Sequence, residues 1–353
     1  MLLAVGTHSF SILVEIDRSW EIKDFQILGK GHHYGIGIPK RDGSEFIAKG
    51  GSLKGEGEKF TLWKKIDDKS QSDLYSKEKT FTLSDNEFDH VHQIAHSKDG
   101  LFLANTRYNS IDYIPLNENE NPDNKNGRIV RYTFDEVNYD FNHINSVYPW
   151  GKNNLLVLLN NKGRIESEVV LLETIEDDGS IAELKCKKRL RTWHKGCHNV
   201  FADDKFLVYN ASADGDFVIV DLLKDKKLCS IRFPGHVKGL SVTKDYFIIG
   251  YSEFAERQAR KITRGYLAII DRHTFNVVSK IDLNHPSLPH AVGNVNEVRC
   301  LSERDYGHSF TDIEHRQDFN SLSFSSGDWK HPFVDKINSA QRLLKRGFGA
   351  AKI

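Results

Sequence analysis

Five histidines recur along this chain, and each stands just ahead of a short segment with the apolar and polar alternation of a β-strand. They are His33, His92, His143, His198 and His236. Behind each histidine follow an apolar stretch, a turn of Asp, Lys, Gly or Asn, and a second apolar run. The spacing of about 40–60 residues indicates an array of equivalent units, each with room for about four strands. If these units are blades of a closed ring, the five histidines converge on one axis.

The fold that this period predicts is an all-β single propeller. Counting the first strand of each unit gives six blades, with five or seven as open alternatives, because a sixth first strand begins near Gly293. Residues 2–28 have the pattern of the three strands that this last blade lacks. Pairing N-terminal strands with a C-terminal strand closes the ring and leaves no open sheet edge.

The pattern changes after about residue 303. We therefore predict a propeller domain over 1–303 and an irregular extension over 304–353, with helical spacing at 333–348. This helix is expected either to pack on the propeller or to bind a protein partner. The stretch 253–265 is expected to form a surface loop or a short helix over one face.

Composition excludes few functions but narrows the partners. Lys plus Arg and Asp plus Glu both number 49, so neither nucleic acid nor an anionic membrane is expected as a partner. No segment has the roughly 18 consecutive apolar residues of a membrane span, and the N-terminal stretch has the pattern of strands rather than of a signal peptide. The four cysteines are scattered without a CxxC pair, which favours free thiols in a cytoplasmic protein.

The histidines are candidate metal ligands, because three or more neutral imidazoles that face one point form a site for Zn, Fe or a similar ion. In a propeller, a residue just before each innermost strand lies at the mouth of the central channel. His92, His143 and His198 are the principal candidates, and His33 and His236 are the further ones. The open alternative is that these histidines belong to a structural hydrogen-bond network.

Polar residues near the same strands are candidates for substrate contact and catalysis. Arg107 suits an anionic group on the substrate, and Glu256 is the candidate general base or further ligand. The other candidate substrate-binding residues are Asn105, Thr106, Asn145, Lys238 and Ser252. Each of these side chains is equally compatible with a local hydrogen bond in a turn.

The motifs over about residues 90–301 resemble those of a bacterial β-propeller family of unknown function. The segments are HQIAHSKDGLFLANTR, NHINSV, HNVFADDKFLVYNAS and PGHVKGLSVTKDYFIIGYSEFAE. They match the family pattern HQ…NTR, H-[IL]-N-[SG], H-x-x…N-S and PG-x-x-[RK]-GL…G-x-S…E. The resemblance marks the residues His92, Gln93, Asn105, Thr106, Arg107, His143, Asn145, His198, Lys238, Gly239, Ser252 and Glu256. The family often has an aromatic residue where this chain has His236, which favours a site of three histidines.

Two main hypotheses follow. The first is a metal-dependent enzyme of lyase or hydrolase type, with a divalent ion (Fe, Zn or Mn) at the propeller mouth and a small polar or anionic substrate, such as a carbohydrate or peptide. The second is a non-catalytic propeller that binds a sugar, phosphate or peptide or scaffolds a protein interaction. A third hypothesis is a metal-free transferase, in which the histidines and Arg107 bind phosphate or sulfate and one histidine is the nucleophile.

Overall fold

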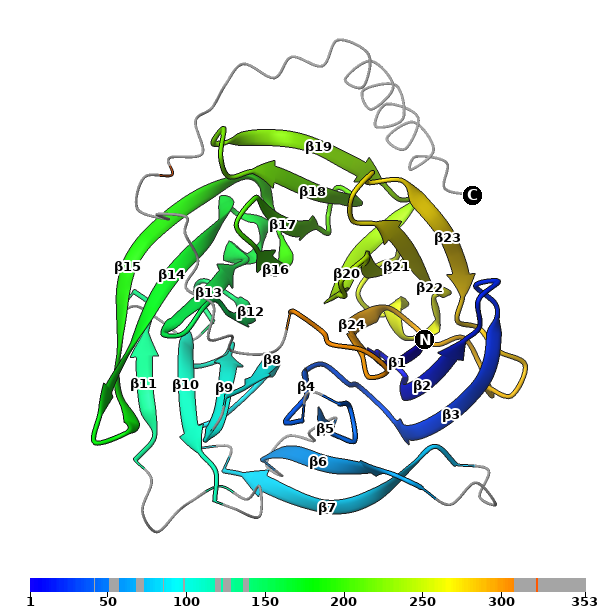
Figure 1. Cartoon of the computed structure of the whole chain (residues 1–353), viewed down its shortest axis with the longest axis horizontal. Helices are drawn as coiled ribbons and strands as arrows, with labels where there is room; N and C mark the ends of the chain where they lie inside the picture. The colour runs from blue at the N-terminus through cyan, green and yellow to red at the C-terminus, as the bar shows by residue number, and fades with distance from the viewer. Residues whose placement is uncertain are drawn as a thin grey trace, which may run out of the picture.

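The computed structural model of the chain contains six four-stranded antiparallel sheets around one central axis (Figure 1). It describes residues 1–40, 42–50, 57–67, 73–84, 86–97, 99–117, 122, 128–135, 140–307 and 322. The predicted all-β propeller with six blades is confirmed. The expected helix at 333–348 lies outside the described residues, as does nearly all of the extension over 304–353.

We number the blades 1–6 in chain order and give each from its innermost strand outward. Blade 1 has β24 (Val295–Cys300), β1 (Leu2–Thr7), β2 (Phe10–Ile16) and β3 (Ile22–Lys30); blade 2 has β4 (Ile36–Gly37), β5 (Glu45–Lys49), β6 (Glu58–Lys65) and β7 (Tyr75–Leu83). Blade 3 has β8 (Val91–His96), β9 (Gly100–Asn105), β10 (Ser110–Pro115) and β11 (Val130–Thr133); blade 4 has β12 (Ile144–Pro149), β13 (Asn154–Leu159), β14 (Glu166–Asp177) and β15 (Ser180–Lys195). Blade 5 has β16 (His198–Ala202), β17 (Phe206–Ala211), β18 (Asp216–Asp221) and β19 (Lys226–Arg232); blade 6 has β20 (Gly235–Val242), β21 (Tyr246–Glu253), β22 (Gly265–Asp271) and β23 (Val277–Asp282).

Blade 1 is assembled from both ends of the chain, as the sequence predicts. Strand β24 pairs antiparallel with β1, and the register joins Leu3 to Cys300 and Val5 to Val298. Residues 2–30 supply the three outer strands β1, β2 and β3. The ring therefore closes through hydrogen bonds between strands almost three hundred residues apart.

The inner strands of each blade are buried on both faces, because each sheet packs between two neighbouring sheets. Strands β9 and β18 are buried at every position, whereas the outermost strands β19 and β23 alternate between exposed and partly buried residues. Continuous apolar runs such as FVIV (217–220) therefore fill the core between blades. In the described part of the chain, no helix is long and apolar enough to cross a membrane.

The histidine repeat marks where the innermost strands begin. His198 is the first residue of β16, His92 and His236 are the second residues of β8 and β20, and His143 immediately precedes β12. His33 lies three residues ahead of the two-residue strand β4. The starts of the innermost strands lie at one end of the channel, together with the connections that hold the 3₁₀ turns η1 (Asn161–Gly163) and η2 (Arg260–Ile262).

A buried ion pair lies on the innermost strand of blade 1, against blade 6. The Arg299 guanidinium is 3.0 Å from the Glu297 carboxylate, and the two side chains are only 1% and 2% exposed. The same guanidinium nitrogen donates to the carbonyls of Val298 and Leu240, and Leu240 belongs to β20. The pair therefore ties the closing strand to the preceding blade.

We expect Arg299→Met to destabilise the protein by about 3–5 kcal/mol, because it leaves the buried Glu297 carboxylate without its countercharge. Urea unfolding followed by circular dichroism measures the change. Arg264→Met is the matched control, since the Arg264–Asp282 pair is exposed and such pairs contribute little. Equal destabilisation by the two substitutions would show that the buried pair has no special part in closing the ring.

Candidate functional site

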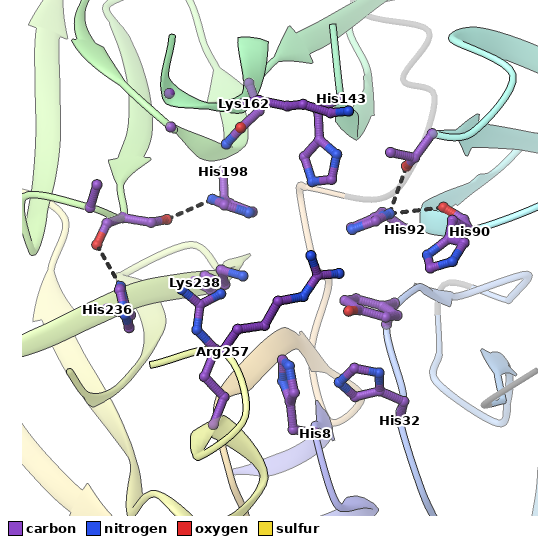
Figure 2. A pocket seen from close by; sticks show the side chains of 18 of the residues that line it. His8, His32, His90, His92, His143, Lys162, His198, His236, Lys238 and Arg257 are labelled. Atoms are coloured by element: carbon purple, nitrogen blue, oxygen red, sulfur yellow. Dashed lines mark hydrogen bonds between the residues drawn. The ribbon is translucent and has the colours of Figure 1, made fainter. Parts of the chain in front are cut away.

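A cavity of about 1030 Å³ opens at the end of the channel where the innermost strands begin (Figure 2). All six blades contribute to its lining, through the starts of the inner strands and the loops beside them. We call it the mouth cavity. The residues that line it are His8, His32, Tyr34, His90, His92, Thr106, Arg107, Asp140, His143, Asn160, Lys162, Gly163, Gly196, His198, Ser212, Ala213, His236, Lys238, Arg257, Gln258, Arg260 and Lys261.

His92 and His198 are held in the same way by two equivalent blades. The hydroxyl oxygen of Thr106 lies 2.6 Å from His92 Nδ1, and that of Ser212 lies 2.8 Å from His198 Nδ1. Each hydroxyl donates its hydrogen to a backbone carbonyl of the next blade's innermost strand, so it accepts a hydrogen from the imidazole. In both rings Nδ1 therefore carries the hydrogen and Nε2 keeps its lone pair.

His143 is oriented by a carboxylate instead of a hydroxyl. Its Nδ1 lies 2.7 Å from Asp140 Oδ1, and Lys162 Nζ lies 2.8 Å from the other oxygen of Asp140. The pKa of Asp140 is lowered because hydrogen bonds from His143 and Lys162 outweigh its burial, so the carboxylate is ionised and accepts. Nδ1 of His143 therefore carries the hydrogen that Asp140 accepts.

The backbone at this place is strained. Asp140, His143 and Lys162 adopt left-handed conformations, with φ of 57°, 50° and 53°, and His90 on the same rim has φ of 56°. Such conformations are uncommon outside glycine and cluster at functional sites, where the surrounding structure holds them. Here an amide chain through Asn142 helps to hold the two connections, because Asn142 Nδ2 donates to Asn161 Oδ1 at 3.1 Å.

His236 shares its anchor with His198. Its Nδ1 lies 3.3 Å from the backbone oxygen of Ser212, which can only accept, so His236 also keeps its Nε2 lone pair when neutral. Ser212 therefore contacts both rings, with its hydroxyl bonded to His198 and its carbonyl oxygen bonded to His236.

Four histidine rings and one tyrosine ring form a continuous belt around part of the mouth. Ring centroids lie 3.8 Å apart for His8 and His32, 5.0 Å for His32 and Tyr34, 4.5 Å for Tyr34 and His92, and 5.1 Å for His92 and His143. Most of these contacts are tilted or edge-to-face, which is the arrangement that aromatic quadrupoles favour.

Burial keeps four imidazoles of the mouth neutral. Desolvation lowers the pKa of His8 to about 2, with repulsion from His32 as the next cause, and that of His32 to about 4, with repulsion from Lys49 and Lys238 as the next causes. The pKa values of His92 and His198 lie well below the ordinary 6.5, chiefly through desolvation. These four rings therefore offer neutral nitrogen lone pairs and N–H groups at pH 7.

The formal charges in the mouth are predominantly positive. Arg257 and Arg260 enter it from the β21–β22 connection, and Lys238 enters from β20, as Figure 2 shows for Lys238 and Arg257. Among the described residues, Asp140 is the only carboxylate that lines the cavity, and it is already paired with His143 and Lys162. Desolvation, followed by repulsion from Arg260 and Arg257, lowers the pKa of Lys238 to about 7.

Several predicted site residues lie in the mouth and others do not. His92, His143, His198, His236, Thr106, Arg107 and Lys238 line the mouth cavity. Among those outside it, Asn145 lines a smaller cavity below, and Asn105 is fully buried and donates to Asp112 and to the Glu87 carbonyl. The Ser252 hydroxyl accepts from Val295 N, and Glu256 is exposed on the loop and does not line the cavity.

His33 is replaced at the mouth by its neighbour. Its side chain is buried under blade 1, where Nε2 lies 3.3 Å from the Lys30 carbonyl, and His32 lines the cavity instead. Because strand β4 is only two residues long, the chain ahead of it has no strand register to fix which histidine faces the channel.

The sequence analysis missed the residues that come from connections. These include His8, Asp140, Lys162 and the cations Arg257 and Arg260. The run ERQARKITR (256–264) was a usable signal, since four cations within eight residues of a loop indicate an electropositive surface. Asp140 gave none, because its role depends on a left-handed turn.

The candidate metal ligands are only partly brought together. The rings of His92 and His143 are neighbours, but His198 makes no ring contact with either in the described part of the chain. No group of three or more His, Cys, Asp or Glu side chains among the described residues is arranged to hold a metal ion.

Comparison with known proteins identifies the fold and no more. No family model and no curated protein matches this sequence. Among solved structures, a chain of a nidogen/laminin complex aligns with a TM-score of 0.57 at 9% identity, covering 86% of this chain and 99% of that chain. A protein of unknown function from Bacteroides caccae aligns with a TM-score of 0.53 at 12% identity, covering 84% and 97%. A Bacteroides fragilis protein provisionally named a 6-phosphogluconolactonase aligns with a TM-score of 0.51 at 12% identity, covering 84% and 96%.

We expect the free energy of unfolding to fall as the pH is lowered from 6.5 toward 4. The unfolded histidines bind protons near 6.5, whereas folded His32 binds one only near 4 and folded His8 near 2, so acid favours the unfolded chain. Urea unfolding of the wild type and of His32→Asn at pH 7, 6 and 5 measures the slope, which should be shallower in the variant. His273→Asn is the control, because His273 is exposed and lies outside the mouth. An unchanged slope in His32→Asn would contradict the burial argument.

Proposed function

We propose that the mouth cavity binds a small anionic molecule with a phosphate, sulfate or carboxylate group. The observation that carries this proposal is the set of basic side chains Lys238, Arg257 and Arg260, which line one cavity without an ion pair to any carboxylate of the described residues. Cations that crowd together in a partly desolvated place repel one another, and a bound anion removes that repulsion. Guanidinium groups also match the geometry of phosphate and carboxylate oxygens.

The neutral imidazoles complement this arrangement. A histidine that keeps one N–H and one lone pair can donate to an anion oxygen or accept from a ligand hydroxyl, without adding further charge. His92 and His198 have their Nδ1 hydrogens committed to protein oxygens, so they offer the Nε2 lone pair as an acceptor. The mouth is thus suited to a ligand that carries both a negative group and hydrogen-bond donors.

The anion proposal is tested by titrating inorganic phosphate into the wild type and into Lys238→Met, Arg257→Met and Arg260→Met by isothermal calorimetry. We expect each variant to bind phosphate about tenfold more weakly, because a hydrogen bond to a charged partner contributes about 1.5–3 kcal/mol. Arg264→Met is the matched control: it lies on the same loop but pairs with Asp282 and does not line the cavity. Absence of phosphate binding in the wild type, or equal losses in the control, would refute the proposal.

A second candidate function is a metal-dependent enzyme of lyase or hydrolase type acting on such an anion. The observation in its favour is that His92, His143 and His198 each direct Nδ1 to a protein oxygen, which is how metal-binding histidines are oriented. The surrounding cations oppose a free divalent ion, so this candidate requires the anionic substrate to balance the charge. A divalent ion such as Zn, Fe or Mn would supply Lewis acidity toward a substrate oxygen. Arg107 and Lys238 would then orient the anion.

The metal candidate predicts about one equivalent of Zn, Fe or Mn per chain after expression in metal-supplemented medium, as measured by plasma mass spectrometry. The double variant His92→Ala/His143→Ala should lose this metal, since both rings flank the same point. His236→Ala, which removes another histidine of the mouth, is the comparison. Metal-free wild-type protein from such medium would refute the metal-dependent function while leaving the anion proposal standing.

We further propose that the chain belongs to the uncharacterised bacterial propeller family whose motifs it resembles. Its supporting observation is that His92, Thr106, Arg107, His198 and Lys238, which lie in separate motifs, line one cavity.

A further inference from the structure

We propose that the floor of the mouth is a hydroxyl-binding subsite and that the ligand is a hydroxylated anion, such as a sugar phosphate or a sugar acid. The inference rests on the proposed anion-binding function and deepens it by naming the ligand class. Its basis is a pair of buried amide oxygens that lack a donor, in residues that line a second, smaller cavity against the first.

The second cavity measures about 10 Å³. Tyr34, His92, His198 and Lys238 line both cavities, so the small one adjoins the floor of the mouth. A volume of this size is close to that of a single water-sized group, which makes a hydroxyl the natural occupant in size. Its remaining lining comes from the innermost strands, at positions just inside the histidines.

Asn145 and Asn296 reach this cavity with fixed amide orientations. Asn145 Nδ2 donates to the Cys197 carbonyl at 2.9 Å, and Asn296 Nδ2 donates to the His33 carbonyl at 3.0 Å. Flipping either amide would place its oxygen against a carbonyl oxygen, so the observed orientation is enforced. The two side chains are 5% and 7% exposed, and neither Oδ1 has a hydrogen-bond partner among the described residues.

Asn199 and Glu297, which also line the small cavity, are paired within the protein. Asn199 Oδ1 accepts from Gly239 N at 2.8 Å, and Gln93 Nε2 donates to Glu297 at 3.0 Å. Glu297 is also paired with Arg299 at 3.0 Å. The two asparagine oxygens therefore stand out as buried acceptors without a donor among the described residues, and such acceptors are costly.

A hydroxyl supplies the missing donor better than a cation does. Lys238 lines the same small cavity, and Glu297, the carboxylate that also lines it, is already paired with Arg299, so a further positive charge is not favoured there. A hydroxyl donates one hydrogen bond and brings no charge.

The two cavities together specify one ligand. Because the cavities share four lining residues, one molecule can place an anionic group beside Lys238 and Arg257 and a hydroxyl in the small cavity that Asn145 and Asn296 line. Phosphate esters of polyols and sugar acids share this chemistry, and they differ only in the anionic group.

The test compares inorganic phosphate, glycerol 3-phosphate, glucose 6-phosphate and gluconate by isothermal calorimetry on the full chain. We expect at least one hydroxylated anion to bind about tenfold more tightly than inorganic phosphate, since a satisfied buried hydrogen bond is worth about that factor. At least one of Asn145→Leu and Asn296→Leu, the one that removes the oxygen accepting from the hydroxyl, should remove most of this preference and leave the affinity for inorganic phosphate within about twofold. The phosphate and gluconate arms separate phosphate esters from carboxylates.

Asn153→Leu is the matched control. Asn153 Oδ1 also lacks a partner among the described residues, but it lies in the β12–β13 turn and lines neither cavity. The control should keep the wild-type preference. Wild-type protein that binds phosphate without preferring any hydroxylated anion would overturn the inference alone, as would asparagine variants that weaken all anions equally. Wild-type protein that binds none of the four would overturn the proposed function as well.

Discussion

Closure of the ring by pairing β24 with β1 is the interaction on which the rest of the structure depends. Blades 2–6 are each continuous in the chain, but blade 1 forms only when the N-terminal strands pair with β24 (Val295–Cys300). That strand carries Asn296, Glu297 and Arg299, so closure also completes the floor of the channel. A chain whose ring fails to close would lack both a complete blade 1 and one wall of the candidate site.

The same geometry that repeats the blades also repeats the hydrogen bonds of the mouth. His92 with Thr106 and His198 with Ser212 are equivalent pairs, and each hydroxyl spans two blades by donating to the next innermost strand. One hydroxyl therefore fixes an imidazole tautomer by accepting from Nδ1 and joins neighbouring sheets by donating to a carbonyl. This double role explains why the histidines fit both a structural hypothesis and a functional one: the network is structural at Nδ1 and leaves Nε2 for a ligand.

The period and the alternation of the sequence predict the propeller well, because strand length and inter-blade burial leave a strong mark on every unit. The histidines that begin regular strands, such as His92 and His198, are likewise placed correctly at the mouth. The sequence predicts His33 rather than His32 as a residue of the mouth, because it cannot show that β4 has only two residues. Arg257 and Asp140 come from connections whose backbone paths depend on tertiary contacts, and alternation says nothing about them.

The electrostatic character of the mouth follows from an imbalance between basic and acidic side chains. Desolvation lowers the pKa values of His92 and His198 well below 6.5, so the formal charges beside them belong to basic side chains and to one carboxylate that is already paired. Nothing else in the described lining offsets Lys238, Arg257 and Arg260. A folded protein tolerates such a cluster when the cations remain near water or when a ligand neutralises them, and the lowered pKa of Lys238 reflects its desolvation and its repulsion from the two arginines. The asparagine oxygens without a donor line a cavity with the same lysine, so the hydroxylated anion that we propose would supply both the missing negative charge and the missing donor.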